Sequence, residues 1–200
     1  MTNPIIETVS AWLAAEGIDR DSYRTVMRQW VSQAYDSEHG DNPIHALERG
    51  EASNAEFEQA LAGQLVLTDG GPVPGEGLLD RMFAATALDP AMLTLFRRLH
   101  AAGIPTGLLS NSWGDGYPRE MFPDLFDAVV ISAEVGMRKP EPRIFRHAAE
   151  LLGLDPRECI FIDDIEANIT ASQDAGFTGI LHTSAPQTQR QVAELLGIEL

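Results

Sequence analysis

The chain has 200 residues, of which 44% are hydrophobic and 22% charged, a usage that is typical of globular proteins and excludes disordered, collagenous and coiled-coil classes. Its 14 basic and 30 acidic side chains give a net charge of −16, which repels polyanions and argues against nucleic-acid binding and against an anionic membrane surface. The single cysteine, Cys159, excludes an internal disulfide and a cysteine-rich zinc site. We therefore expect a protein of a reducing compartment, and small-molecule ligands stay open.

The N-terminal residues do not have the pattern of a targeting or membrane segment. They lack a basic start, and Glu7, Trp12 and Glu16 interrupt their apolar residues. No apolar run elsewhere approaches the roughly eighteen residues that a membrane span needs. The sequence therefore predicts a cytoplasmic protein.

The first part of the chain has the periodicity of helices. Apolar residues recur at helical spacing in two stretches, residues 6–13 and 23–31. Ser53, followed three residues later by Glu56, forms a capping-box pattern that predicts a third helix as far as about Val66. We therefore expect a small helical unit at this end of the chain.

A run rich in glycine and proline, residues 70–77, divides the chain unequally and is the best candidate for a linker. The pattern before it is helical, whereas strand-like and helical patterns alternate after it. The sequence therefore predicts a helical domain over residues 1–77 and a second domain over residues 78–200.

The second domain has the sequence pattern of an α/β fold. Short apolar runs alternate with amphipathic segments, which predicts right-handed βαβ units in a parallel sheet covered by helices on both faces. In such sheets, ligands bind at the carboxyl ends of the strands. The expected strands are residues 104–110, 128–132, 159–163 and 179–182, and the expected helices are residues 90–102, 142–152 and 167–175.

Polar residues follow two of these predicted strands. Ser110 supplies a hydroxyl at the end of the first, and Asn111 lies where a turn can bind an anion, although a plain turn or helix cap is the alternative. Lys139 follows the second strand in a loop braced by Pro140 and Pro142, although a single lysine in a loop is usually solvated. These three polar residues are candidates for an anion site.

Two adjacent carboxylates, Asp163 and Asp164, end the apolar segment CIFIDD. Neighbouring carboxylates at the mouth of a sheet repel each other unless a cation neutralises them, and Mg²⁺ prefers such oxygen ligands. The alternative is a helix N-cap with a favourable charge in the first turn. The pair is therefore a candidate metal site.

The order of these residues resembles the haloacid dehalogenase (HAD) superfamily over most of residues 89–183. In GLLSNSWG, Ser110 resembles the second motif, whose hydroxyl binds the transferring phosphoryl group. In GMRKPEPRIF, Lys139 resembles the third-motif lysine, which neutralises the nucleophile and the phosphate. In FIDDIEANI, Asp163 and Asp164 resemble the acids of the fourth motif, which hold Mg²⁺ directly or through water.

This resemblance implies a Rossmannoid α/β core with a small helical cap, because residues 5–85 resemble the cap that the superfamily's first cap class inserts after its first strand. It also implies that Ser110 and Lys139 are catalytic, that Ser110, Asn111 and Lys139 bind the phosphoryl oxygens, and that Mg²⁺ is the cofactor. The adjacent carboxylates favour a phosphatase acting on a small phosphorylated metabolite, since a dehalogenase displaces halide without Mg²⁺.

One part of the family's pattern has no counterpart in this chain. The catalytic aspartate of the family ends a first strand that precedes the cap, whereas here the helical pattern begins at about residue 4. Residues 1–4 resemble the sequence that follows this motif, so we expect the nucleophile to be encoded upstream of Met1. We also expect no phosphatase turnover from the 200-residue chain, and unpaired edges on the strands that begin at Ile104 and Cys159.

Other functions stay open at this stage. The chain is alternatively a catalytically dead phosphate-binding or regulatory protein of the same fold, a 2-haloacid dehalogenase-type hydrolase, or a structural partner that forms a homodimer through its cap. Trp113 either lines the entrance to the site or packs between a loop and a helix.

Overall fold

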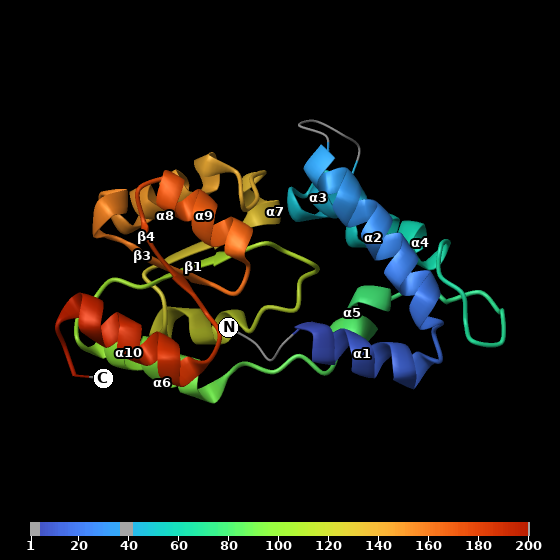
Figure 1. Ribbon diagram of the computed structural model, residues 1–200, viewed down its shortest axis with the longest axis horizontal. Coiled ribbons are helices and arrows are strands. Elements are labelled where there is room, and N and C mark those ends of the chain that lie inside the picture. The colour runs from blue at the N-terminus through green and yellow to red at the C-terminus, as the bar shows by residue number, and fades with distance from the viewer. Residues whose placement is uncertain (1–4, 37–41, 200) are drawn as a thin grey trace. The chain divides into compact units, whose positions relative to one another are not determined.

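The computed structural model describes residues 5–36 and 42–199 and divides into two compact units (Figure 1). Of the described residues, the helical unit contains 5–36, 42–87 and 112–116, and the α/β unit contains 88–111 and 117–199. None of the helices in the described ranges is long and apolar enough to cross a membrane.

The helical unit packs around one apolar cluster. Its largest buried members include Trp12, Trp30, Phe57 and Leu61, and the rings of Trp30 and Phe57 meet edge to face. Because these side chains recur at helical spacing, each helix turns one apolar face toward the cluster. The helices of this unit are α1 (Ile5–Glu16), α2 (Arg20–Asp36), α3 (Pro43–Glu48), α4 (Asn54–Ala62) and α5 (Leu78–Phe83).

The predicted capping box is present at the start of α4. Ser53 Oγ accepts a hydrogen bond from the backbone N–H of Glu56, and the Glu56 carboxylate accepts one from the backbone N–H of Ser53. The backbone N–H and the hydroxyl of Ser53 both donate to the Glu56 carboxylate, and these two hydrogen bonds hold the pKa of Glu56 below its usual value. The helix ends at Ala62, so the predicted end near Val66 is wrong, because Gly63 caps the helix and is a poor helix former.

The division between the units differs from the predicted boundary at residue 77. Leu78 and Leu79 of α5 are buried in the apolar cluster of the helical unit. The Glu58 carboxylate accepts hydrogen bonds from backbone N–H groups at the start of α5, at 3.0 and 3.1 Å. The glycine- and proline-rich run over residues 70–77 is therefore a loop inside the helical unit rather than a linker between the two units.

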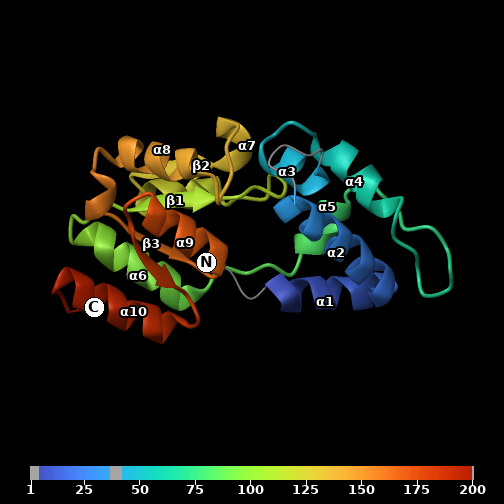
Figure 2. The ribbon, with the colours of Figure 1, turned by 45° about the horizontal axis from the view of Figure 1, so that its top comes forward.

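The α/β unit places parallel strands between two layers of helices, which confirms the predicted α/β class. Figures 1 and 2 show α8 and α9 on one face of the strands and α6 and α10 on the other. The elements are α6 (Pro90–Ala101), β1 (Gly107–Ser110), the 3-10 helix η1 (Arg119–Asp124), β2 (Ala128–Ile131), α7 (Ser132–Val135), α8 (Pro142–Leu152), η2 (Pro156–Glu158), β3 (Ile160–Asp163), α9 (Glu166–Asp174), β4 (Thr178–Leu181) and α10 (Ala185–Leu196).

Successive residues of β3 contribute to opposite layers of the core, as the two-residue period of a strand requires. Phe161 packs in the cluster that contains Phe145 of α8, whereas Ile160 and Ile162 pack against the cluster that contains Met92 of α6. The strands therefore carry apolar residues on both faces, which explains why the sequence shows continuous apolar runs instead of alternation.

The strands form two two-stranded parallel sheets in the described part of the chain, where the sequence predicted one. β1 pairs with β2, β3 pairs with β4, and β1 and β3 each keep an edge without a strand partner among these residues. The first strand also begins at Gly107 instead of Ile104, because Pro105 has no N–H and the N–H of Thr106 donates to the Asp127 side chain. The prediction that a further strand is encoded upstream of Met1 stays a prediction.

Candidate functional site

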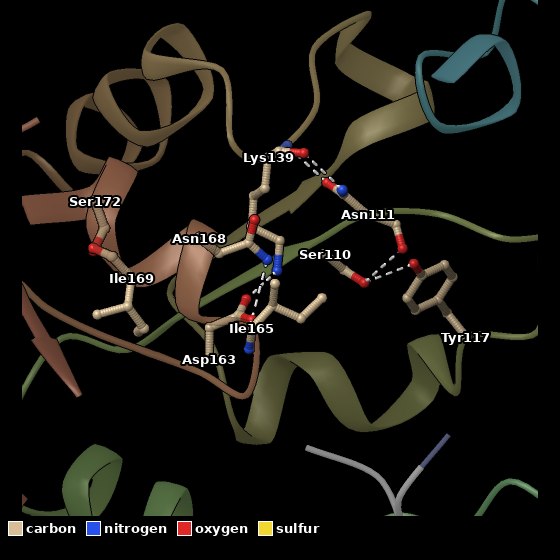
Figure 3. Close-up of polar contacts among 9 residues, drawn as sticks. All are labelled: Ser110, Asn111, Tyr117, Lys139, Asp163, Ile165, Asn168, Ile169 and Ser172. Atoms are coloured by element: carbon tan, nitrogen blue, oxygen red, sulfur yellow. Dashed lines mark hydrogen bonds and ion pairs between the residues drawn. The ribbon is translucent and has the colours of Figure 1, made fainter. Parts of the chain in front are cut away.

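The carboxyl ends of β1 and β3 and the loop after α7 bring four predicted site residues together: Ser110, Asn111, Lys139 and Asp163 (Figure 3). Ser110 and Asp163 are the last residues of their strands. Because parallel strands end at the same edge of an α/β layer, residues far apart in the sequence meet there. The hydrogen bonds among them join the ends of the two separate sheets.

Asn111 fixes the backbone of Lys139 by two hydrogen bonds. Its Oδ1 accepts from the Lys139 N–H at 2.8 Å, and its Nδ2 donates to the Lys139 carbonyl at 3.0 Å. The side-chain amide therefore positions the lysine loop, a task that the sequence did not indicate. Its predicted contact with a phosphoryl oxygen stays a prediction, for which one Nδ2 N–H is left.

The side chain of Lys139 reaches Asp163 in a nearly buried ion pair. Lys139 Nζ lies 2.6 Å from Asp163 Oδ2, with side-chain exposures of 11% and 6%, and 5.6 Å from the centroid of the Phe161 ring. An ammonium group has three N–H donors, so two of them have no hydrogen-bond partner among the described residues. These two N–H groups can donate to further oxygen acceptors.

Asp163 is held by three donors. Its Oδ1 accepts from the backbone N–H of Ile165 at 2.8 Å and from Nδ2 of the buried Asn168 at 3.1 Å, in addition to the Lys139 contact at Oδ2. The bond from Ile165 ties this carboxylate to the residue that precedes α9. Ile165 is the N-cap of that helix and no side chain caps it, so the aspartate pair does not form the helix N-cap that the sequence left as an alternative. Asp164 is exposed, and the structure records no hydrogen bond or ion pair for its carboxylate within the described ranges.

The carboxylate oxygens of Asp163 and Asp164 fit a hydrated Mg²⁺ ion that is weakly held. A carboxylate offers about four acceptor positions, and Asp163 has already used three of them, whereas Asp164 has its full set. Mg²⁺ usually keeps several waters and takes one or two carboxylates together with substrate phosphates. In the described part of the chain, no group of three or more His, Cys, Asp or Glu residues is arranged for a metal ion.

Ser110 has a partner that the sequence analysis missed. Its Oγ lies 2.9 Å from the hydroxyl of Tyr117, and 3.4 Å from the carbonyl oxygen of Asn111. Tyr117 follows the loop after β1 and matches none of the motifs identified above, so only a tyrosine a few residues beyond the Ser-Asn pair could have drawn attention to it.

Trp113 packs within the helical unit, to which its segment belongs. Its ring meets the rings of Phe57 and Phe83 edge to face, and its Nε1 donates to Glu48 Oε1 at 2.9 Å. Of the two interpretations that the sequence left open, the structure therefore shows Trp113 packed between a loop and helices.

Replacing Asn111 with alanine is expected to lower the free energy of unfolding of the α/β unit by about 2 kcal/mol, because two partly buried hydrogen bonds to Lys139 are lost at about 1 kcal/mol each. Urea unfolding measures the change. Asn111→Asp keeps the acceptor for the Lys139 N–H and loses the donor, so its effect is expected to be smaller. Equal stability of wild type and Asn111→Ala would mean that these bonds do not hold the loop.

The chain is similar in sequence to known hydrolases over most of its length. The profile of the haloacid dehalogenase-like hydrolases matches residues 1–176. The chain is 25% identical to the bifunctional epoxide hydrolase 2 of Mus musculus over 187 residues, which are 86% of this chain and 34% of that protein. It is 32% identical to a sesquiterpene phosphatase of Aspergillus oryzae over 113 residues, 54% of this chain and 58% of that one. The chain thus spans about a third of the mouse relative.

Solved structures share the fold. A HAD family enzyme of Bacteroides thetaiotaomicron, crystallised in complex with magnesium and inorganic phosphate, superposes with a TM-score of 0.58 at 24% sequence identity. The superposition covers 82% of this chain and 86% of that one. At this level of identity the likeness concerns the fold, and it agrees with the α/β class described above.

Proposed function

The chain belongs to the haloacid dehalogenase-like hydrolase family, and we propose that it is a Mg²⁺-dependent phosphatase acting on a small phosphorylated metabolite. The observation that carries the proposal is the nearly buried Lys139 ammonium, which has one carboxylate partner and two further N–H donors. Leaving such donors unsatisfied is costly, and a phosphoryl dianion satisfies them with charge-assisted hydrogen bonds. The resemblance to a sesquiterpene phosphatase supports the same chemistry.

In this proposal, Lys139 and Ser110 are the catalytic residues. Lys139 binds phosphoryl oxygens through its two remaining N–H groups, and Ser110 donates its hydroxyl proton to another oxygen. Asn111 positions Lys139 through the two hydrogen bonds to its backbone and has one N–H left for the ligand. Because Lys139 is nearly buried, its charge acts through a medium less polarisable than water and stabilises the negative charge of the transferring group more strongly.

Asp163 and Asp164 would hold Mg²⁺, which when bound offsets the negative charge of the phosphoryl oxygens. Asp163 has a second task, because its carboxylate accepts a hydrogen bond from Lys139 Nζ and so holds the ammonium group at the strand ends. The exposed Asp164 can turn toward a ligand without losing a recorded hydrogen bond in the described ranges.

The nucleophile of the family's reaction is an aspartate. In the described part of the chain, Asp163 is the carboxylate that contacts Lys139, and three donors already occupy its oxygens, which lowers their nucleophilicity. We therefore assign the nucleophile neither to Asp163 nor to the exposed Asp164. The expectation that it is encoded upstream of Met1 stays a prediction, with a turnover assay as its test.

Mg²⁺ titrated alone is expected to bind with a dissociation constant of about 1 mM, because two carboxylates and water form most of its coordination shell. Inorganic phosphate is expected to tighten this binding, since both ions would share the site. Isothermal titration calorimetry measures both affinities. Asp164→Asn should abolish the Mg²⁺ signal, and Glu166→Gln, which removes an exposed carboxylate two residues further on, should leave it unchanged. Micromolar affinity that persists in Asp163→Asn would contradict the assigned site.

A second candidate function is phosphate binding without turnover. It is favoured by the finding that, in the described ranges, Asp163 is the one carboxylate in contact with Lys139. Both functions predict phosphate binding that depends on Lys139, and hydrolysis of an aryl phosphate separates them. A 2-haloacid dehalogenase would instead release halide from a haloacid in the presence of a chelator.

A further inference from the structure

The hydroxyl of Ser110 is held by the side chain of Tyr117. The two oxygens lie 2.9 Å apart, at the distance of a good hydrogen bond between hydroxyl groups, and either oxygen can be the donor (Figure 3). Residues 112–116 separate the two in sequence and belong to the helical unit, whereas Tyr117 belongs to the same α/β unit as Ser110. The contact is therefore internal to the unit that carries the candidate site.

The ring of Tyr117 packs at one end of a series of aromatic rings. It meets Phe122 of η1 edge to face at 6.3 Å between centroids, Phe122 meets Phe126 at 5.9 Å, and Phe126 meets Phe96 of α6 at 5.6 Å. Edge-to-face pairs of this kind add stability beyond the area that they bury. The chain of rings anchors the Tyr117 ring to a helix of the core and so restricts where its hydroxyl can lie.

The direction of the Ser110 proton follows from the donors and acceptors of the two hydroxyls. A serine hydroxyl has one proton to donate and two lone pairs to accept. A phosphoryl dianion has only acceptors, so Ser110 can bind it only by donating that proton. Its other recorded acceptor, the Asn111 carbonyl oxygen, lies at 3.4 Å and is a weak competitor.

We propose that Tyr117 is a positioning residue, whose phenol donates its proton to Ser110 Oγ and thereby directs the Ser110 proton to a phosphoryl oxygen. This inference rests on the proposed function, because it assigns Ser110 a phosphoryl ligand. The geometry that supports it is the 2.9 Å contact between the two hydroxyls together with the ring support behind Tyr117.

The test is the affinity of the 200-residue chain for inorganic phosphate in the presence of Mg²⁺, measured by calorimetry for wild type, Tyr117→Phe, Ser110→Ala and the double variant. Tyr117→Phe removes only the hydroxyl and is expected to weaken phosphate binding about 3- to 10-fold, the effect of one neutral hydrogen bond. Ser110→Ala is expected to weaken it about 10- to 100-fold, because its bond is to a charged group. Adding Tyr117→Phe to Ser110→Ala should then have no further effect.

Tyr23→Phe is the matched control, since Tyr23 packs against Trp12 in the helical unit, and it should leave the phosphate affinity unchanged. Equal affinities of wild type and Tyr117→Phe, with Ser110→Ala still weakened, would overturn the role of Tyr117 and leave the proposed function standing. A loss from Tyr117→Phe that is equally large in the Ser110→Ala background would show a merely structural role and also overturn it. If wild type binds no phosphate at millimolar concentration, the proposed function itself fails.

Discussion

The Lys139→Met variant is expected to lose about 3 kcal/mol or more of the free energy of unfolding of the α/β unit. Lys139 and Asp163 form an ion pair at 2.6 Å with side-chain exposures of 11% and 6%. Methionine preserves most of the volume of the lysine stem but removes the charge, which leaves the Asp163 carboxylate buried beside only two neutral donors. Removing one partner of a buried pair typically costs about 3–5 kcal/mol, far more than removing an exposed one.

The readout for this variant is the alkylation of Cys159 across a urea gradient. Cys159 is buried immediately before β3, and burial raises the pKa of its thiol, so it is protected while the α/β unit is folded. Tryptophan fluorescence serves as the control for the helical unit, because Trp12, Trp30 and Trp113 all pack there.

The double variant Lys139→Met/Asp163→Asn separates the charge effect from the packing effect. Because both charges are then removed, the loss of stability is expected to be well below the sum of the two single losses. Additive losses would mean that the two side chains do not form the pair described here. A loss below about 1 kcal/mol in Lys139→Met would place the ammonium in contact with water and remove the main support for a ligand-directed lysine.

Periodicity and caps predicted most of the α/β unit from the sequence. The Asp89-Pro90 pair predicted the start of α6, where the Asp89 side chain accepts hydrogen bonds from the N–H groups of Ala91 and Met92. Helix α8 begins and ends at the expected residues, Pro142 and Leu152. Such local signals lie within a few residues of the boundary that they set.

Strand pairing could not be predicted in the same way. It depends on backbone partners distant in sequence, and the apolar runs of β1 and β3 are the same whether a neighbouring strand is present or not. The predicted boundary between the two units differs from the observed one for a related reason. Residues 70–77 have the composition of a linker, but the buried Leu78 and Leu79 pack back into the helical cluster, and composition contains no information about that contact.

The sequence motifs predicted which residues belong to the candidate site, but they could not predict the contacts among its side chains. Ser110, Lys139 and Asp163 were identified by type and order, and the structure brings them to the same strand ends. The positioning of Lys139 by Asn111 and the contact of Tyr117 with Ser110 depend on side-chain orientation, which spacing does not encode.

A large effect is also expected for phosphatase turnover. The 200-residue chain is expected to show no chelator-sensitive hydrolysis of an aryl phosphate, because the described residues place no carboxylate other than Asp163 against Lys139. The same chain extended by the codons that precede Met1 in the gene is expected to be active if they encode an apolar strand that ends in aspartate. Orientation and charge stabilisation by the residues already in place would then account for most of the lowering of the barrier.

If the extended protein is active, Lys139→Ala is expected to lower its rate roughly 100-fold or more, as for the loss of a single contact to the transition state. Because this variant is also destabilised, the rate is expressed per folded molecule, with the folded fraction taken from the protection of Cys159. Unchanged turnover per folded molecule would exclude Lys139 from the reaction.

The most direct test of a phosphatase site at the ends of β1 and β3 is aryl phosphate hydrolysis by the two proteins side by side, with and without a chelator. We expect no hydrolysis by the 200-residue chain and, if the preceding codons encode a strand that ends in aspartate, turnover by the extended protein that the chelator abolishes. Robust chelator-sensitive turnover by the 200-residue chain would show that its nucleophile is one of the carboxylates set aside above. No hydrolysis by either protein would contradict the phosphatase assignment and favour phosphate binding without turnover.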